Sequence, residues 1–570
     1  MSQLKNRKSK GSQKSQIDSS SQLDPLNQNK LNDDSEFDKK SSKYKRNFSL
    51  WNIWVAATIL KVLLFDTYHS TDFDVHRNWL AITNKLPIRE WYLEKTSQWT
   101  LDYPPFFAYF EWFLSQFVPS IVQQDGCLDI VPKGVYGWPT VVFQRSTVIV
   151  SEILLFAILQ TFINISDDKI SSFIIASSLV LSPGLLIVDH IHFQYNGMMF
   201  GLLVGVIVAA RHEKYYLLGA LFASLLCFKH IFLYVAPAVF VYLLRNVVLD
   251  VSQKSIIKFI KWDKLIKLGS IVIIIFTLAF APFAYYQVLP QLFERLFPFS
   301  RGLTHAYWAP NVWAIYSFLD KVLIVISKRP YFNNILTKTI GIPSIDIINE
   351  KILAAGNTGT KGLVQDVSFI ILPNITPKVT FLLTLFYDIL SLLPLLLQPN
   401  FKRFVGALTL NAYASFLFGW HVHEKAIMLI IIPFTFLINE RRLLNSFLII
   451  AGSGYVSLFP LLPNQNLIKQ FYTLIWFIIY SLSFMEVSKQ KTSQNRIFLF
   501  DRISLVYLSS LIPMVLMVFF IDQFKSQIPI LSKFEFVGLM IYSVYCGIGV
   551  ISSWFGLSWL YFFEDSIWEE

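Results

Sequence analysis

Two aspartates open the first of four short polar segments in which the side chains able to do chemistry gather. Asp72 and Asp74 lie in the segment Thr71–Trp79, directly after the first apolar run of the chain. Carboxylates two positions apart point the same way in a strand and nearly opposite ways in a helix. A carboxylate shielded at a membrane surface could act as a general base. Two structural alternatives stay open: Asp72 could cap a helix, and Asp74 could pair with Arg77.

The second polar segment places an acid before a double proline. Asp102 and Tyr103 precede Pro104 and Pro105, and the prolines force an extended or turn conformation. Asp102 is therefore a further acidic candidate. The alternative is a turn in which Asp102 bonds its own backbone.

The third polar segment, Asp189–Gly197, lies between two apolar runs and contains His190, His192, Gln194 and Asn196. An acid and two histidines this close together raise the possibility of a metal site. Two histidines two positions apart would share a face in a strand, but a short turn between helices contains no strand. We expect instead that Gln194 and Asn196 contact the hydroxyl groups of a substrate.

The fourth polar segment is basic and has two parts, Arg301–Trp308 and His421–Lys425. In a helix over the second part, His421 and Lys425 would share a face. Arginine, histidine and lysine that converge at a membrane interface suit a phosphate group. The alternative is that these long basic side chains only reach toward lipid headgroups. Together the four segments predict a carboxylate base, an anion-binding basic group and aromatic loops that can stack on sugar rings.

The composition places these segments in a membrane protein. Of 570 residues, 54% are hydrophobic and 15% are charged, against about 25% charged in a soluble domain. Such a chain hides apolar surface in lipid, which excludes a soluble, a disordered or a disulfide-rich secreted protein. Three cysteines allow one disulfide at most, so disulfides do not organise the fold. The net charge of +11 fits basic cytosolic loops better than nucleic-acid binding.

The apolar runs predict an all-α polytopic membrane protein with about fourteen transmembrane helices. Residues 1–45 are polar and are expected to form a disordered cytosolic tail, and residues 46–560 the membrane domain. The pair at 215–246 could also be a single broken helix. The expected spans are 48–67, 145–165, 170–188, 197–211, 215–230, 231–246, 266–286, 378–398, 404–420, 425–440, 444–461, 469–486, 500–521 and 535–556.

Charge predicts which side of the membrane carries the polar segments. With the N-terminal tail in the cytosol, most cytosolic connections are rich in lysine or arginine, as the positive-inside rule requires. Residues 561–570 then also lie in the cytosol. The polar segments fall on the opposite side, where two connections, 68–144 and 287–377, are long. The working surface is therefore expected to face the lumen of the secretory pathway or the cell exterior.

Four motifs resemble the eukaryotic dolichyl-phosphate-glucose glucosyltransferases of the N-glycan precursor pathway. The motifs are Ser70–Thr83, Leu101–Phe106, His192–Gly197 and Val422–Lys425. The likeness extends over residues 48–560 and leaves out only the tail. Three further details, at 68–70, 301–311 and 419–421, resemble the branch that adds the second glucose rather than the branch that adds the first.

The resemblance implies a polytopic C-type glycosyltransferase fold in the endoplasmic reticulum membrane, with a luminal active site between the two long loops. It implies that glucose passes from dolichyl-phosphate β-glucose to the terminal glucose of Glc1Man9GlcNAc2-PP-dolichol, with an α-1,3 bond formed by inversion. The implied partners are these two lipid-linked substrates and the bilayer, without nucleic acid. No cofactor is expected, and no metal, because a lipid phosphate is already a good leaving group.

The resemblance also suggests roles for single residues. Asp72 matches the catalytic base, and Asp74 and Asp102 are supporting acids. The basic residues expected at the donor phosphate are Arg301, His421, His423 and Lys425. The remaining candidates for substrate binding are Trp79, Tyr103, His192, Gln194, Asn196, His305, Tyr307, Trp308 and Glu424.

Two other functions stay open at this point. The first is the neighbouring branch of the same family, which would glucosylate Man9GlcNAc2-PP-dolichol. The second is a polytopic transporter. Transporters carry ionisable residues in mid-membrane and often contain internal repeats, whereas these polar segments lie at helix ends on one side and no repeat is evident. A purely structural membrane protein is less expected, because acids, bases and aromatic residues gather on one face.

Overall fold

The fold is taken from a computed structural model of the chain. It describes residues 48–253, 259–297, 302–304, 308–329, 331, 333, 337–338, 345–355, 369–462, 498–528 and 536–569. Contacts divide the chain into Met1–Ser49 and Leu50–Glu570, and the description below concerns the second unit. The expected tail at 1–45 lies outside the described residues, and the expected domain boundaries stay predictions.

Every regular element in the described residues is helical, as the sequence predicts. Extended pairing there is limited to two isolated bridges, Leu249 with Ile260 and Thr304 with Val422. The three cysteines, Cys127, Cys227 and Cys546, are buried and free. The prediction that disulfides do not organise the fold is therefore confirmed.

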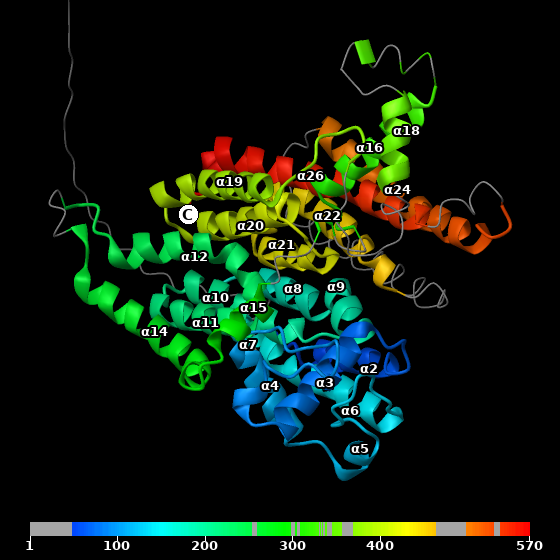
Figure 1. The fold of residues 1–570 in the computed structure, drawn as a ribbon. Helices are drawn as coiled ribbons and strands as arrows, with labels where there is room; N and C mark the ends of the chain where they lie inside the picture. The colour runs from blue at the N-terminus through cyan, green and yellow to red at the C-terminus, as the bar shows by residue number, and fades with distance from the viewer. Residues whose placement is uncertain are drawn as a thin grey trace, which may run out of the picture. The chain divides into compact units, whose positions relative to one another are not determined.

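The first part of the chain, blue to cyan in Figure 1, contains short helices between longer ones. Its elements are α2 (Trp51–Leu63), α3 (Thr71–Lys85), η1 (Ile88–Glu90), α4 (Pro105–Ser115), α5 (Ser120–Gln124), α6 (Trp138–Ser151), α7 (Ile153–Ile165), α8 (Lys169–Val180), α9 (Pro183–Leu185), the π-helical turn η2 (Leu186–Ile191), α10 (Asn196–Arg211) and α11 (Tyr215–Phe228).

The rest of the chain continues from green to red in Figure 1. Its elements are η3 (His230–Val235), α12 (Ala236–Leu243), η4 (Leu244–Val248), α14 (Trp262–Tyr285), α15 (Leu289–Leu296), α16 (Val312–Ser327), α18 (Ile345–Ala355), α19 (Pro377–Leu397), α20 (Phe401–Phe418), η5 (Glu424–Ile427), α21 (Met428–Phe434), η6 (Thr435–Leu437), α22 (Arg441–Val456), η7 (Phe459–Leu461), α24 (Phe498–Phe524), α26 (Val537–Phe563) and η8 (Asp565–Ile567).

Eight helical stretches in the described residues are long and apolar enough to cross a membrane. Three shorter apolar helices, α2, α10 and α11, coincide with further expected spans. The protein is therefore a multi-pass membrane protein. The eight stretches are Trp138–Ile165, Lys169–Ile191, His230–Val248, Trp262–Tyr285, Pro377–Leu397, Arg441–Leu461, Ile503–Phe524 and Val537–Phe563.

The remaining expected spans differ from these eight. The run at 404–420 forms α20, most of which is buried inside the protein. The run at 425–440 is divided into η5, α21 and η6, with Pro433 near the end of α21, because proline removes a helical hydrogen bond. The run at 469–486 lies outside the described residues. The helix expected at 145–165 begins earlier, at Trp138.

The break within 215–246 occurs at one residue. Lys229 has φ −152° and ψ 120°, an extended conformation that ends α11 and precedes η3. The sequence left open whether this region is one broken helix or two spans. A single charged residue in extended conformation separates the two helices.

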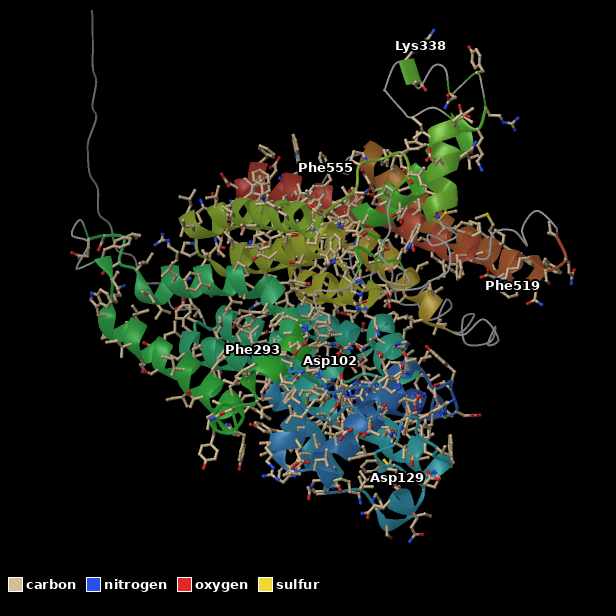
Figure 2. The ribbon with its side chains drawn as sticks, in the orientation of Figure 1. Asp102, Asp129, Phe293, Lys338, Phe519 and Phe555 are labelled. Carbon is tan, nitrogen blue, oxygen red and sulfur yellow. The ribbon has the colours of Figure 1, made fainter. Side chains whose placement is uncertain are left out.

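Packing joins the helices that hold the polar segments. The helix α3 packs on α4, α10 packs on α7, α11 and α21, and η2 packs on η7. Gly201 allows the close approach of α10 to α7, because a Cβ there would lie 3.0 Å from the backbone of Leu155. Large apolar side chains on the outside suit a lipid contact, as at Phe555 of α26, which is 60% exposed and labelled in Figure 2.

Candidate active site

The helix α3 begins so that Asp72 lies in its first turn. Ser70 caps the helix, and its hydroxyl accepts a hydrogen bond from the Phe73 backbone N–H at 3.4 Å. The same hydroxyl donates to the backbone carbonyl of His192. The alternative in which Asp72 is the capping residue is therefore wrong. The first turn of a helix stabilises a negative charge through the helix dipole, so this position favours an ionised Asp72.

Three polar side chains from distant parts of the chain surround the Asp72 carboxylate. The Lys425 ammonium lies 2.7 Å from Oδ2, although the two residues are 353 positions apart. The Gln194 side-chain amide donates to the same oxygen, and His192 Nε2 lies 3.2 Å from it. The Asp72 side chain remains 22% exposed, so a substrate can reach it.

These contacts keep Asp72 ionised. Burial alone raises the pKa of this carboxyl group, but the Lys425 charge outweighs burial and holds the pKa well below its usual range. A carboxylate that is charged at neutral pH is in the state that a general base requires.

His192 joins Lys425 to the wall of the site. Burial first and the Lys425 charge second lower the pKa of His192, so the ring is neutral. Lys425 can only donate, so His192 Nε2 accepts its hydrogen bond at 3.1 Å. The Nδ1–H then donates to the Tyr68 hydroxyl oxygen at 2.7 Å, and Tyr68 donates to the carbonyl of Leu461.

The π-helical turn η2 brings the third polar segment to the site. Asp189, at the inner end of this turn, accepts hydrogen bonds from the Asn196 side chain at 2.9 Å and the Gly197 backbone N–H at 2.6 Å. Asn196 also donates to Gln194 at 2.7 Å. Single π turns often occur at functional sites. Of the sequence candidates, Asp72, His192, Gln194, Asn196 and Lys425 form one connected group.

Lys229 belongs to the same group, and sequence reasoning missed it. Its ammonium donates to Asn196 Oδ1 at 2.9 Å and lies 4.9 Å from the centre of the Tyr103 ring. A lone lysine at the end of an apolar run is usually taken for a side chain that reaches the interface. The signal that could have found it is a charged residue inside a long apolar stretch, which is a functional candidate by default.

The other acids of the first two segments serve elsewhere. Asp74 accepts a hydrogen bond from the Tyr136 hydroxyl at 2.7 Å, while Arg77 donates to the backbone carbonyls of residues 126, 127 and 129. An ion pair between Asp74 and Arg77 does not form. Asp102, labelled in Figure 2, is a charged neighbour of Lys229 and of Arg295 on α15.

Aromatic residues pack under the site. Trp79 is 2% exposed, and its indole N–H donates to the carbonyl of Thr100 at 3.0 Å. Its ring lies 4.9 Å from that of Tyr103, which is partly exposed. In this arrangement Trp79 supports the segment around Tyr103.

The segment His421–Lys425 does not form the helix considered above. His421 has φ +53°, its backbone N–H donates to the carbonyl of Leu303, and its Nδ1 lies 2.8 Å from the carbonyl of Gly302. These contacts dock the segment on the second long loop, and η5 begins only at Glu424. His421 and Lys425 therefore do not share a helix face.

The remaining basic and aromatic candidates are unevenly placed. His423 packs its ring edge-on against that of His421 at 5.4 Å, and Glu424 is 1% exposed. The Trp308 carbonyl accepts a hydrogen bond from Ser543 of α26 at 2.8 Å. The candidates Arg301, His305 and Tyr307 lie outside the described residues.

A second group of charged residues contacts η2, and no sequence motif connects its members. Glu152 forms an ion pair with Lys61 of α2 and accepts a hydrogen bond from His190 of η2 at 2.8 Å. Arg145 donates to the carbonyls of His190 and, at 3.1 Å, Tyr68. The contacts of Glu152 and Arg145 with His190 fix the position of η2.

The described residues contain no group of three or more histidine, cysteine, aspartate or glutamate residues arranged to hold a metal ion. Of the acid and two histidines that raised the possibility, Asp189 binds Asn196, His190 binds Glu152, and His192 contacts Tyr68 and Lys425. The expectation that no cofactor or metal takes part stays a prediction.

Comparisons with known proteins agree with this chemistry. The model of the ALG6, ALG8 glycosyltransferase family matches residues 57–557. A Kluyveromyces lactis protein and a Saccharomyces cerevisiae protein are each 59% identical over 92% of this chain, covering 95% and 93% of their own lengths. A Neurospora crassa protein is 48% identical over 90% of this chain and 99% of its own length. All three are named dolichyl pyrophosphate Glc1Man9GlcNAc2 alpha-1,3-glucosyltransferase.

Proposed function

This chain belongs to the ALG6, ALG8 glycosyltransferase family, and on that premise we propose that it adds an α-1,3-linked glucose to Glc1Man9GlcNAc2-PP-dolichol, with dolichyl-phosphate glucose as donor. The similar proteins carry this acceptor and this linkage in their names. The observation that carries the chemical proposal is the Asp72 carboxylate, ionised and partly exposed, with Lys425 at 2.7 Å.

The proposed reaction is one in-line displacement with inversion. The 3-hydroxyl of the terminal glucose attacks the anomeric carbon of the donor, whose bond to the phosphate oxygen breaks. The hydroxyl proton goes to Asp72, and dolichyl phosphate leaves with the bonding electron pair. The β-linked donor then gives an α-linked product, which requires the base and the leaving group to lie on opposite sides of the sugar.

Lys425 is proposed to stabilise the charge that develops on the leaving group. In the structure its ammonium is paired with Asp72. As Asp72 takes up the proton it loses its negative charge and its attraction for the ammonium, while the phosphate gains a charge. A preorganised positive charge that turns from the base to the leaving phosphate would stabilise the transition state. This role joins the sequence prediction of a phosphate-binding lysine with the contact to the base.

The remaining candidates have supporting parts in the proposal. His423, with Arg301 and His421, is proposed to complete the binding of the donor phosphate. Asp74 and Asp102 support the loops around the acceptor. The proposed sugar contacts come from Gln194, Asn196, His192, Tyr103 and Glu424. His305, Tyr307 and Trp308 are further proposed substrate-binding residues, and the buried Trp79 supports Tyr103.

The proposed location is the endoplasmic reticulum membrane, with the site in the lumen and both termini in the cytosol. The basic connections that the sequence places on the cytosolic side support this orientation. The expected spans at 425–440 and 469–486, one broken and one outside the described residues, make a direct topology test worthwhile.

An acceptor assay tests the proposal. Purified protein in detergent receives radiolabelled dolichyl-phosphate glucose and either Glc1Man9GlcNAc2-PP-dolichol or Man9GlcNAc2-PP-dolichol. We expect transfer to the first acceptor only, with the product sensitive to an α-1,3-specific glucosidase. Transfer to the unglucosylated acceptor would instead place the chain in the other branch of its family.

A further inference from the structure

A directional chain of hydrogen bonds connects Lys229 to the Asp72 carboxylate. Lys229 donates to Asn196 Oδ1 at 2.9 Å, Asn196 Nδ2 donates to Gln194 Oε1 at 2.7 Å, and Gln194 Nε2 donates to Asp72 Oδ2. Asn196 Nδ2 also donates to Asp189 Oδ1 at 2.9 Å. Each amide in the chain therefore accepts at one end and donates at the other.

Chemistry forces this direction. An ammonium group only donates, so the Asn196 atom that faces Lys229 must be its oxygen. With its oxygen toward Lys229, the Asn196 amide turns its NH2 group toward Asp189 Oδ1 and Gln194 Oε1. Lys229 and Asp189 thus hold the Asn196 amide from two sides. The clamped NH2 group in turn sets the orientation of Gln194.

The consequence for Asp72 is that its two oxygens differ. Within the described residues, the hydrogen bonds from Lys425 and Gln194 to this carboxylate both end on Oδ2, and His192 Nε2 lies 3.2 Å from the same oxygen. Among the described residues, none of these three contacts ends on the other oxygen, Oδ1. A carboxylate held by one oxygen cannot rotate to present the other without losing these bonds.

We propose that Lys229 is a positioning residue, which acts through Asn196 and Gln194 to hold Asp72 by Oδ2 and so directs the acceptor proton to Oδ1. The inference rests on the proposed function and adds a residue that none of the sequence motifs contains. Lys229 itself does not touch the reacting atoms. Its effect belongs to the rate of transfer rather than to the affinity for either substrate.

Two variants of Lys229 distinguish a role in positioning Asp72 from a role in stabilising the fold. Lys229→Met keeps the apolar stem but leaves Asn196 Oδ1 unpaired, whereas Lys229→Arg keeps a charged donor. Hydrogen bonds to charged groups contribute enough that we expect kcat to fall about 10- to 100-fold in Lys229→Met, with both KM values within about threefold of wild type. We expect Lys229→Arg to recover most of kcat. Lys267→Met, at a lysine that stacks on Tyr216, is the matched control.

The pH profile of kcat gives a second, independent readout. The charged and titratable neighbours of Asp72 are Lys425, His192, Lys229 and Tyr103. His192 is neutral because its pKa is lowered, and Tyr103 is neutral because burial raises its pKa, so the acid limb reports Asp72.

Gln194→Glu tests the chain at its other end. The glutamate has the size of the glutamine but faces Asp72 with a second carboxylate. We expect the acid limb to rise by about one pH unit or more, because a like charge raises the pKa of a carboxyl group.

Three results would overturn the proposal. The first is a kcat of Lys229→Met equal to that of the wild-type protein. The second is a loss confined to the KM of the donor, which would make Lys229 a phosphate ligand. The third is an acid limb of the kcat profile in Gln194→Glu that coincides with that of wild type. If Lys229→Met does not accumulate, the proposal is tested by this third result. Wild-type protein assayed in parallel shows whether the proposed function itself has failed.

Discussion

Replacing Lys425 by methionine removes the charge that keeps Asp72 ionised, while the burial of Asp72 remains. An opposite charge at this distance lowers the pKa of an aspartate by about 1–3 units, and the ammonium lies 2.7 Å from Oδ2. In folded wild-type protein the pKa of Asp72 is depressed. Asp72 therefore stays ionised as the pH falls, until the pH passes through that low pKa. Without Lys425 the largest contribution that lowers the pKa is lost, while the burial that raises it remains. We therefore expect the acid limb of kcat to move up by about 1–3 pH units.

The assay is glucosyl transfer by purified Lys425→Met and wild type between pH 5 and pH 8, with saturating acceptor and donor. If the new pKa reaches about 6, activity at pH 5.5 falls to about a quarter of that at pH 7.5. Wild type is expected to change little over this range. Lys425→Arg keeps the charge and serves as the control, with an acid limb close to that of wild type. An acid limb in Lys425→Met that coincides with that of wild type would refute the reasoning.

Two further predictions concern stability and topology. Lys61→Met removes one partner of a buried ion pair with Glu152 and is expected to cost about 3–5 kcal/mol of stability. Lys264→Met, at an exposed lysine, is the control. A melting temperature of Lys61→Met in detergent that matches that of Lys264→Met would contradict the prediction. A protease-cleavable tag beside α18, near residue 350, is expected to be protected in sealed microsomes and cleaved after detergent; cleavage in sealed vesicles would reverse the proposed orientation.

The sequence predicted the members of the site better than their partners. Asp72 and Lys425 were both identified, one as a base and one as a phosphate ligand. Their direct contact spans 353 positions, and no local pattern encodes such a pairing. Lys229 was overlooked for the opposite reason, because its single charge at the end of an apolar run matches the common interfacial lysine.

Predictions from residue spacing were wrong where contacts with distant parts of the chain determine the local conformation. A helical reading of His421–Lys425 is reasonable by spacing, but His421 adopts φ +53° and binds the backbone of residues 302 and 303. The pairing of Asp74 with Arg77 failed similarly, since Tyr136 and the carbonyls around residue 127 offer better partners. The helical class and most spans were predictable, because lipid requires long apolar helices. The span expected at 404–420 forms the buried helix α20 and stays a prediction, because burial in protein and burial in lipid select the same residues.

The central claim is that Asp72 accepts the proton of the acceptor hydroxyl. Asp72→Asn keeps the size and polarity of the side chain but removes the base, so the most direct measurement is the single-turnover rate of glucose transfer to Glc1Man9GlcNAc2-PP-dolichol by this variant. Loss of a general base costs about 100- to 10,000-fold in rate, and we expect a loss of this size with normal protein levels. A transfer rate within a few fold of wild type would contradict the account.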